Sequence, residues 1–508
     1  MENEEYGIGW LTVARVAELL GKELIGKLAD IGSRLRGPVY LTGGTVRDLL
    51  LDRVPADIDL TVPGAARQWA AELSRQTGGT SVPLGKDEDA ARVVWQGRDI
   101  DFSSFREGAQ TIDEELIKRD ITVNSLAVSL DGLLRPGADP VSPGLELIDP
   151  VGGLADLEQK TVRMTSPESF QKDPLRLLRV FRFAAVLDFT VDKETMDLVV
   201  RRGDWISRPA AERVAGELDL IMESDRAPQA IFALARSGLL FNIIPELLAG
   251  VGMEQPPSHH LDVFDHCLAT LDCMVQVQRD PRRFFPRYAE VPTAYLAKDR
   301  RRVQLRWAAL LHDLGKPLTM TIDENRGGRI TFYNHDRAGA ELVEEVARKL
   351  KWSRADTRIV AGLVALHMRP FHLGNVRRRE ELSLKACLRL VRLVGPELPG
   401  LFLLSMADAL AGLGEGRPEE VEKEVASLFA RMEEVRREHV EPVRSGPPLL
   451  TGRDLIKELH LAPGPLFRKI LDGVEEAHMV RQTMTRQEAL ELARSFLGPG
   501  QRNGDRQG

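Results

Sequence analysis

Two adjacent glycines, followed thirteen residues later by two aspartates, constrain the fold of this chain more than any other feature. Gly43 and Gly44 follow the apolar residues 39–41, as in a strand that turns into a helix. Because glycine has no Cβ, the backbone amides of such a turn can approach phosphates closely. Asp57 and Asp59 alternate with apolar residues, so both carboxylates point to one face of a strand. Paired carboxylates can hold the divalent ions that phosphoryl transfer requires, so the sequence predicts a site for nucleotide phosphate chemistry.

The ordered pair resembles the nucleotidyltransferase head of the DNA polymerase β superfamily. More narrowly, it is similar to the bacterial tRNA nucleotidyltransferase and poly(A) polymerase family, the class II CCA-adding enzymes. The family's first motif, Gly-Gly-x-Val-Arg-Asp followed by Asp-x-Asp, corresponds here to residues 43–48 and 57–59. The resemblance implies that catalysis and Mg²⁺ binding fall to Asp57 and Asp59, and that the triphosphate is seated by Gly43, Gly44 and Arg47. An arginine suits this role because its guanidinium is a rigid fork of donors.

A second run, residues 118–126, resembles the family's Arg-Arg-Asp-Phe-Thr-Ile-Asn-Ala motif. In that motif the aspartate contacts the ribose and an arginine meets phosphate, and a carboxylate can accept hydrogen bonds from a 2′-hydroxyl. The resemblance therefore implies nucleotide contacts for Arg119, Asp120 and Asn124. Lys118 replaces the usual arginine, which keeps the charge but loses the bidentate geometry.

Residues 170–179 resemble the family's base-selecting motif, usually Glu-Asp-x-x-Arg. Cytosine and adenine both present an exocyclic amino donor beside a ring-nitrogen acceptor. Asp173 can accept from the amine, and Arg176, three residues later on the same helical face, can donate to the ring nitrogen. Arg179 completes the expected nucleotide-binding set. Lys172 stands where the family has a glutamate that helps to hold the pair, so selectivity for C and A is left open.

The segment between Arg106 and Lys118 is short, with only eleven residues. CCA-adding relatives usually carry a longer flexible loop there, associated with the switch from C to A. The short segment resembles CC-adding relatives, which stop after two cytidines. Addition of CC or A alone, and poly(A) polymerase activity, therefore remain alternatives to complete CCA addition.

A second constellation resembles the metal site of HD phosphohydrolases. Its members, in family order, are His266, His312, Asp313, His335, His367 and Asp408. An adjacent His-Asp pair supplies a nitrogen and a bridging oxygen, and further histidines can complete one or two octahedral ions. The resemblance implies one or two divalent transition metals or Mg²⁺, and hydrolysis of cyclic phosphates or RNA 3′ ends. His259 and His260 are candidates for the mouth of this site, and Lys316 either meets phosphate or caps its helix.

The chain, with 508 residues, is too long for one hydrophobic core. Strand and helix patterns alternate from residue 39 to about 151, and the rest is mostly helical. We therefore expect an α+β protein in which a small mixed-sheet polymerase-β-type nucleotidyltransferase head precedes an elongated all-α neck, HD body and tail. The expected domains are an N-terminal helix 1–35, the head 36–150, the neck 151–225, the helical HD body 226–440 and a tRNA-binding tail 441–508, with disorder from 498.

Bulk composition bears on location and partners. The three cysteines form no CxxC pair, and we find no signal peptide and no apolar run of transmembrane length, so we expect a cytoplasmic protein without membrane contact. The net charge of −7 argues only on average against nucleic-acid binding, because basic runs occur at 282–287, 298–302 and 377–379. The resemblance implies the tRNA 3′ end, CTP and ATP as partners. The oligomeric state is left open.

The leading hypothesis is a template-independent nucleotidyltransferase that adds C, A or both to the tRNA 3′ end and carries a metal-dependent HD phosphohydrolase. One alternative is a poly(A) polymerase, which the HD residues disfavour. Another is an HD phosphohydrolase whose transferase head has become an RNA-binding module. Lys118, Lys172 and the short segment motivate that alternative, and the intact Asp57–Asp59 pair opposes it.

Overall fold

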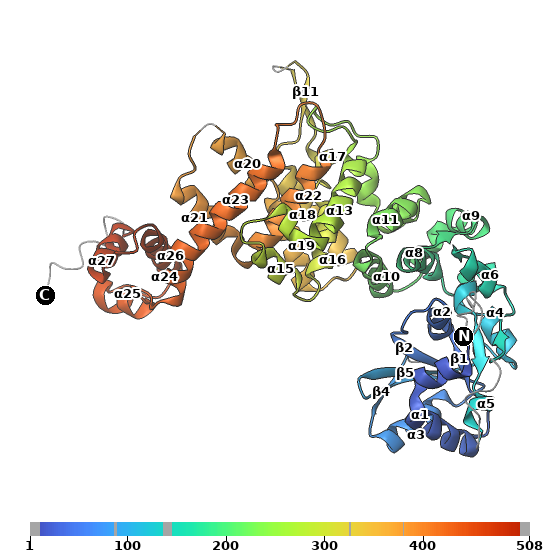
Figure 1. Ribbon diagram of the computed structural model, residues 1–508. Helices are drawn as coiled ribbons and strands as arrows, with labels where there is room; N and C mark the ends of the chain where they lie inside the picture. The colour runs from blue at the N-terminus through green and yellow to red at the C-terminus, as the bar shows by residue number, and fades with distance from the viewer. Residues whose placement is uncertain (1–10, 86–88, 136–144, 325–326, 379, 498–508) are drawn as a thin grey trace, which may run out of the picture. The chain divides into compact units, whose positions relative to one another are not determined.

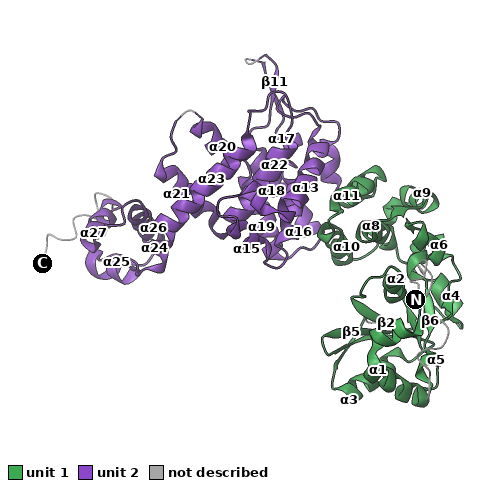
Figure 2. Cartoon of the chain, viewed as in Figure 1, with its two compact units in different colours: residues 1–243 green, residues 244–508 purple. Residues whose placement is uncertain are grey.

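The computed structural model describes residues 11–85, 89–135, 145–324, 327–378 and 380–497. The start of the predicted N-terminal helix and the predicted disorder from 498 lie outside these residues. The chain divides into two compact units, residues 1–243 and 244–508 (Figure 2).

The first unit is built around a mixed sheet (Figure 1), which has seven strands among the described residues, in the order β3-β4-β5-β2-β1-β6-β7. The strands are β1 Tyr40–Thr42, β2 Asp57–Val62, β3 Thr80–Pro83, β4 Ala90–Trp95, β5 Arg98–Ser104, β6 Ala127–Ser129 and β7 Leu147–Ile148. Within this described sheet, β2 and β5 are the one parallel pair. The expected small mixed sheet is confirmed.

Short helices and one long helix complete the head. They are α1 Val13–Leu35, α2 Gly43–Leu50, α3 Ala66–Thr77, α4 Ile112–Ile117, the 3₁₀ turn η1 Thr122–Asn124 and α5 Asp131–Leu134. Apolar residues of α1 recur at helical spacing and are buried, whereas Gly21, with a φ of 74°, interrupts its helical backbone. The helix α3 packs on β4 and β5, where Trp69 stacks on Phe102 with ring centroids 6.4 Å apart.

Helices follow the sheet within the first unit. They are α6 Gly153–Glu158, α7 Pro167–Lys172, α8 Arg176–Leu187, α9 Lys193–Arg202, η2 Gly203–Ser207, α10 Ala211–Glu223, α11 Ala227–Arg236 and α12 Leu239–Ile243. The sequence did not predict the two-residue strands β8 Thr161–Val162 and β9 Thr190–Val191, which pair in parallel. Strands this short are invisible to periodicity, because alternation needs several residues to appear.

The described residues of the second unit are helical apart from one antiparallel strand pair, formed by β10 Thr321–Asp323 and β11 Arg329–Thr331. Its longer helices are α13 Val263–Arg279, α15 Glu290–Leu296, α16 Arg301–Leu311, α18 His335–Lys349, α19 Arg354–Leu366, α20 Met368–Arg377, α21 Leu384–Val394, α22 Leu398–Ala411 and α23 Val421–Val435. Shorter elements are η3 Pro245–Gly250, α14 Pro281–Phe284, α17 Lys316–Thr319, η5 Gly395–Glu397, η6 Arg436–Val440 and α24 Glu441–Ser445. The almost fully buried α22 packs against α13, α16, α19 and α23 (Figure 1).

The C-terminal helices have a hydrophobic cluster of their own. They are α25 Gly452–Leu459, α26 Pro465–Val480 and α27 Arg486–Ser495. Leu455, Ile470 and Ala489, one from each helix, are fully buried in it.

One helical run, residues 384–411, is long and apolar enough to cross a membrane, although the sequence analysis found no such run. However, 67% of the most apolar 18-residue stretch of this run is buried inside the protein, which is typical of the core helix of a soluble protein.

Gly153 provides a test of the packing between α6 and η1. A Cβ there would lie 2.3 Å from the carbonyl oxygen of Thr122, which belongs to the backbone and cannot rotate away. We expect Gly153→Ala to lower the free energy of unfolding by about 2–3 kcal/mol, measured by thermal or urea unfolding. Gly216→Ala in α10 is the matched control, because a Cβ added at Gly216 would meet nothing within 4 Å. Equal unfolding temperatures for the two variants would contradict this packing.

Candidate active sites

Three carboxylates gather where β2 and β5 run in parallel. Their oxygens, from Asp57, Asp59 and Asp101, all lie within 4.8 Å of one another. The predicted placement of Asp57 and Asp59 on one face is confirmed. The sequence analysis missed Asp101, although Asp99 and Asp101 repeat the same alternating pattern on the next strand.

The cluster is electrostatically costly without a bound metal ion. Burial, and next the charge of Asp57, raise the pKa of Asp59 to about 6. Burial and the charge of Asp101 also raise the pKa of Asp57. Like charges this close disfavour ionisation, and a divalent cation removes that penalty. The residues therefore fit a divalent metal site with oxygen ligands.

The glycine turn is pressed against this cluster. Gly43 has a φ of +68°, and a Cβ there would lie 2.7 Å from Nη1 of Arg119 and 3.0 Å from Oδ2 of Asp59. At Gly44 the nearest atom would be 3.5 Å away. The hydroxyl of Thr45 accepts from the backbone N–H of Asp59 at 2.8 Å, which holds β2 beside the N-terminus of α2. The turn therefore brings the N-terminus of α2 next to the carboxylates, although its first amide, that of Gly43, already donates to the carbonyl of Leu126 at 3.1 Å.

The predicted nucleotide-binding residues of the head are buried and mutually bonded. Arg47 donates from Nη1 to the Asn124 side-chain oxygen at 2.6 Å. Arg119 donates from Nη2 to the hydroxyls of Thr42 and Thr61, both at 3.0 Å. Arg119 thus lies beneath the Gly43 turn and supports it.

Asp120 forms an ion pair with Arg179 of α8. Nη2 and Nε of Arg179 donate to the same carboxylate oxygen at 2.6 and 2.9 Å. Burial opposes ionisation of Asp120, but the charges of Arg179 and Arg176 outweigh it and hold its pKa well below the usual value. Asp120 is therefore an anion with one oxygen held by Arg179.

The expectation that Asp173 and Arg176 share one helical face is wrong. The helix α7 ends at Lys172, α8 begins at Arg176, and Asp173 between them is extended, with φ −127° and ψ 91°. The reason is Pro174, because a residue before proline is disfavoured in the α conformation. Asp173 accepts from Nη2 of Arg213 at 2.9 Å. Arg176 instead donates to the backbone carbonyls of Lys118 and Arg119, both at 2.9 Å.

The two lysines that depart from the family pattern meet at one residue, Glu107. Lys172 forms an ion pair with its carboxylate. Lys118 donates to its backbone carbonyl at 3.0 Å. Glu107 lies in the short segment after β5 and has a positive φ of 52°. The short segment is thereby tied to the end of α7, next to Asp173.

The second constellation comes together inside the helical unit. The side chains are buried and come from α13 (His266), the end of α16 (His312, Asp313), the start of α18 (His335), the end of α19 (His367) and α22 (Asp408). Nε2 of His266 lies 3.0 Å from Oδ1 of Asp408, and Nε2 of His335 lies 3.3 Å from Oδ1 of Asp313. The predicted residues therefore form one cluster.

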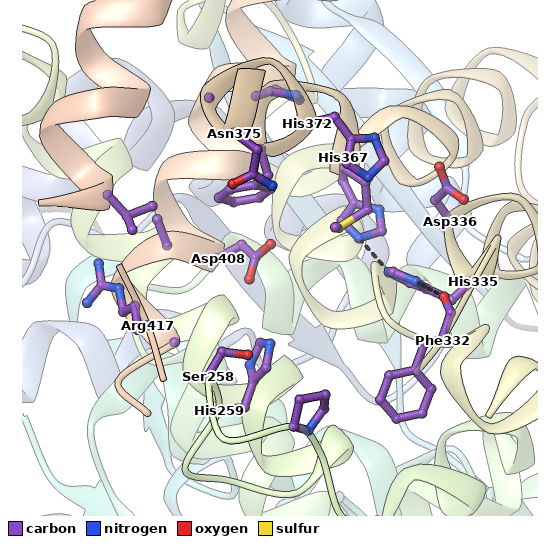
Figure 3. Close-up of a pocket in the computed structure, with 18 of the residues that line it drawn as sticks. Ser258, His259, Phe332, His335, Asp336, His367, His372, Asn375, Asp408 and Arg417 are labelled. Carbon is purple, nitrogen blue, oxygen red and sulfur yellow. Dashed lines mark hydrogen bonds between the residues drawn. The ribbon is translucent and has the colours of Figure 1, made fainter. Parts of the chain in front are cut away.

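Backbone carbonyls fix the tautomer of three of these histidines. Nδ1 of His312, His335 and His367 donates to the carbonyl three residues earlier, at 2.9, 2.8 and 2.7 Å. In the neutral form of each ring the lone pair is therefore on Nε2, and the Nε2 atoms of His335 and His367 lie 3.1 Å apart (Figure 3). The buried Nε2 of His312 has no hydrogen-bond partner among the described residues. Converging lone pairs of this kind are the arrangement that metal-binding histidines require.

A cavity of about 630 Å³ opens onto this cluster. Figure 3 shows His259, Phe332, Asn375 and Arg417 on its walls together with the metal-site residues. His259 lies edge-on to His266, with ring centroids 4.6 Å apart. Of the two histidines expected at the mouth, His260 is exposed and is not part of this wall.

Lys316 also lines this cavity, and its Nζ lies 2.5 Å from Oδ2 of Asp313. It donates to the side chain of Gln255 at 2.6 Å as well. Its ammonium group is therefore directed to the metal-site carboxylate.

Comparisons with known proteins assign a family to each region that holds a candidate site. Residues 39–163 match the family model of the poly A polymerase head domain, residues 188–250 match the probable RNA and SrmB-binding site of polymerase A, and residues 263–412 match the HD domain. An A-adding tRNA nucleotidyltransferase of Deinococcus radiodurans is 34% identical over 88% of this chain and 93% of its own length. A CC-adding tRNA nucleotidyltransferase of Thermus thermophilus is 32% identical over 90% and 92%.

Solved structures share the fold. A CCA-adding enzyme in complex with CTP has a TM-score of 0.62 at 21% identity, over 95% of this chain and 97% of its own. The Thermotoga maritima CCA-adding enzyme complexed with tRNA has a TM-score of 0.58 at 21% identity, over 96% and 99%.

The two glycines of the turn can be separated experimentally. Gly43→Ala combines an unfavourable positive φ with a clash against Arg119 and Asp59, so we expect it to lower the free energy of unfolding by about 2 kcal/mol or more. Gly44→Ala should keep the unfolding temperature and weaken only nucleoside triphosphate binding. Thermal unfolding and nucleotide titration measure the two effects. An intact unfolding temperature for Gly43→Ala would contradict the geometry.

Asp59 should make the metal-free protein less stable at neutral pH. Its folded pKa of about 6 lies above the usual carboxyl value, so the folded state holds the proton more tightly than the unfolded state does. Stability therefore falls as the pH rises from about 4 to 6. We expect Asp59→Asn in EDTA to gain up to about 2 kcal/mol above pH 6 and nothing below pH 4. Unfolding curves across this range test it, and a gain that persists at pH 4 would contradict it.

Proposed function

The chain belongs to the class II tRNA nucleotidyltransferase and poly(A) polymerase family with an HD domain, and from this premise we propose that it adds C, A or both from CTP and ATP to the tRNA 3′ end. The observation that carries the proposal is the three-carboxylate cluster beside the Gly43 turn. The reaction takes place in the cytoplasm, and the HD centre hydrolyses phosphoesters.

Asp57, Asp59 and Asp101 would hold Mg²⁺, which supplies activation of the attacking hydroxyl and charge neutralisation at the departing pyrophosphate. The amides that follow Gly43 at the start of α2 bind the triphosphate, because they lack helical partners and carry the positive end of the helix dipole, whereas the Gly43 amide donates to Leu126. Arg47, also on α2, is held at this triphosphate site by its hydrogen bond to Asn124. Arg179 holds one oxygen of Asp120, and the backbone N–H of Ile121 donates to the other at 2.9 Å, so a ribose hydroxyl would have to share that second oxygen.

The contacts of Glu107 support incomplete addition, either CC or A alone. A pocket that changes its preference from C to A needs a segment that can move between the two states. Lys118 and Lys172 tie the short segment in one place. The two relatives named above, A-adding and CC-adding enzymes, are each named for one kind of nucleotide.

The HD residues would hold one or two divalent ions, and the cavity accepts a phosphoester such as an RNA 3′ or cyclic phosphate. Such ions supply a nucleophilic water and polarise the phosphoryl oxygens. The fixed tautomers of His312, His335 and His367 keep their Nε2 atoms available as ligands. These features also argue against a poly(A) polymerase that lacks an HD centre.

An extension assay that resolves RNA products to a single nucleotide of length decides which nucleotides are added. The protein receives Mg²⁺ and tRNAs that lack CCA, CA or only the final A, with CTP, ATP or both. We expect extension by C alone or by A alone. Extension through the full CCA would overturn the argument from Glu107, and long A tails on any RNA would identify a poly(A) polymerase.

Two variants separate the two centres. Asp57→Ala should reduce nucleotide addition by about a thousandfold or more, because it removes a metal ligand, while phosphate release from RNA ends continues. Asp313→Ala should do the reverse. Nucleotide addition that survives Asp57→Ala would overturn the assignment of the head as the transferase. If the wild type adds no nucleotide but still releases phosphate from RNA ends, the protein is an HD phosphohydrolase whose head has lost transferase activity.

A further inference from the structure

A built-in cation stands beside the carboxylates of the head. Arg92 on β4 donates from Nε to Oδ1 of Asp101 at 2.7 Å and from Nη2 to Oδ2 of the same carboxylate at 2.8 Å. Nη1 donates to Oδ2 of Asp99 at 2.6 Å. Nη2 also lies 3.6 Å from Oδ2 of Asp57. One guanidinium therefore binds Asp101 through two hydrogen bonds and lies near Asp57, the first residue of the predicted metal-binding pair.

Backbone pairing builds this arrangement. Arg92 on β4 is the cross-strand partner of Asp101 on β5, and Asp101 is the cross-strand partner of Asp59 on β2. Directly opposite residues project to the same face of a sheet, so the three side chains form one row. The position of the cation is therefore set by strand register.

The fork has two physical consequences. It holds the Asp101 carboxylate in a single orientation, because two parallel charge-assisted hydrogen bonds restrict rotation. Each oxygen keeps a further lone pair, so Asp101 can still face the other two carboxylates. The positive charge also opposes the field that draws divalent cations to the cluster.

We propose that Arg92 is a positioning residue for the metal centre of the head. Its fork aims Asp101 at Asp57 and Asp59, and its charge lowers the affinity of the nucleotide-free head for divalent ions. This inference rests on the proposed nucleotidyl transfer, because the positioning matters only if the centre transfers nucleotides.

Mn²⁺ binding, followed by electron paramagnetic resonance without nucleotide or RNA, separates charge from geometry. The measurements use the full chain with His312→Ala and Asp313→Ala in every sample, so that the HD centre does not contribute. Arg92→Gln should bind Mn²⁺ about three- to tenfold more tightly, because a nearby positive charge is gone. Its kcat for nucleotide addition should fall about tenfold or more, because Asp101 loses its fork.

Arg92→Lys keeps the charge but not the fork. Its Mn²⁺ affinity should stay within about twofold of the wild type, while its kcat falls as in Arg92→Gln. Arg75→Gln removes the same charge from an exposed position on α3 and should change neither quantity. The opposite directions of affinity and kcat in Arg92→Gln exclude misfolding, which would weaken both.

Arg92→Gln with unchanged or weaker Mn²⁺ binding would overturn the role of the charge, and an unchanged kcat would overturn the role of the fork. If the wild type adds no nucleotide, the proposed function fails, and the effect of the Arg92 fork on kcat fails with it. The Mn²⁺ affinities would still decide the role of the charge, so the two failures are distinguishable.

Discussion

Parallel pairing of β2 with β5 is the contact on which the head depends. It sets Asp59 opposite Asp101 and Asp57 opposite Asp99, and it packs four carboxylates along two neighbouring strands. Such a concentration of charge opposes folding, because buried like charges disfavour ionisation. Arg92 offsets part of it through β4, and a bound divalent ion would offset more. The chemistry of the head and its electrostatic cost therefore have the same origin.

Two half-buried arginines connect this site to the helices that follow the sheet. Arg179 holds Asp120, and Arg176 binds the carbonyls of Lys118 and Arg119. Each contact joins α8 to the segment that lies beneath the Gly43 turn. Breaking one partner of a buried ion pair is costly, because the other charge remains desolvated. The residues of the nucleotide motifs thus also hold the two parts of the first unit together.

The second centre is organised by different means. Its metal-site residues come from five helical elements, and backbone carbonyls orient three of the histidine rings. The resulting cluster directs imidazole lone pairs and carboxylates inward. Mixed nitrogen and oxygen ligands suit transition metals as well as harder ions. The head, in contrast, offers oxygen ligands only, which favours Mg²⁺.

The sequence by itself determined the glycine turn, the Asp57–Asp59 pair, the small mixed sheet and the members of the helical His–Asp cluster. These follow from local chemistry: alternation along a strand, a turn without Cβ atoms, and motif resemblance. Tertiary structure alone decided that Asp101 and Arg92 join the head, because strand register is a pairing between distant segments. It also separated Asp173 from α8, although Pro174 carried a local signal for that break. Tertiary structure also brings Lys118 and Lys172 together at Glu107, because residues far apart in sequence become neighbours only when the chain folds.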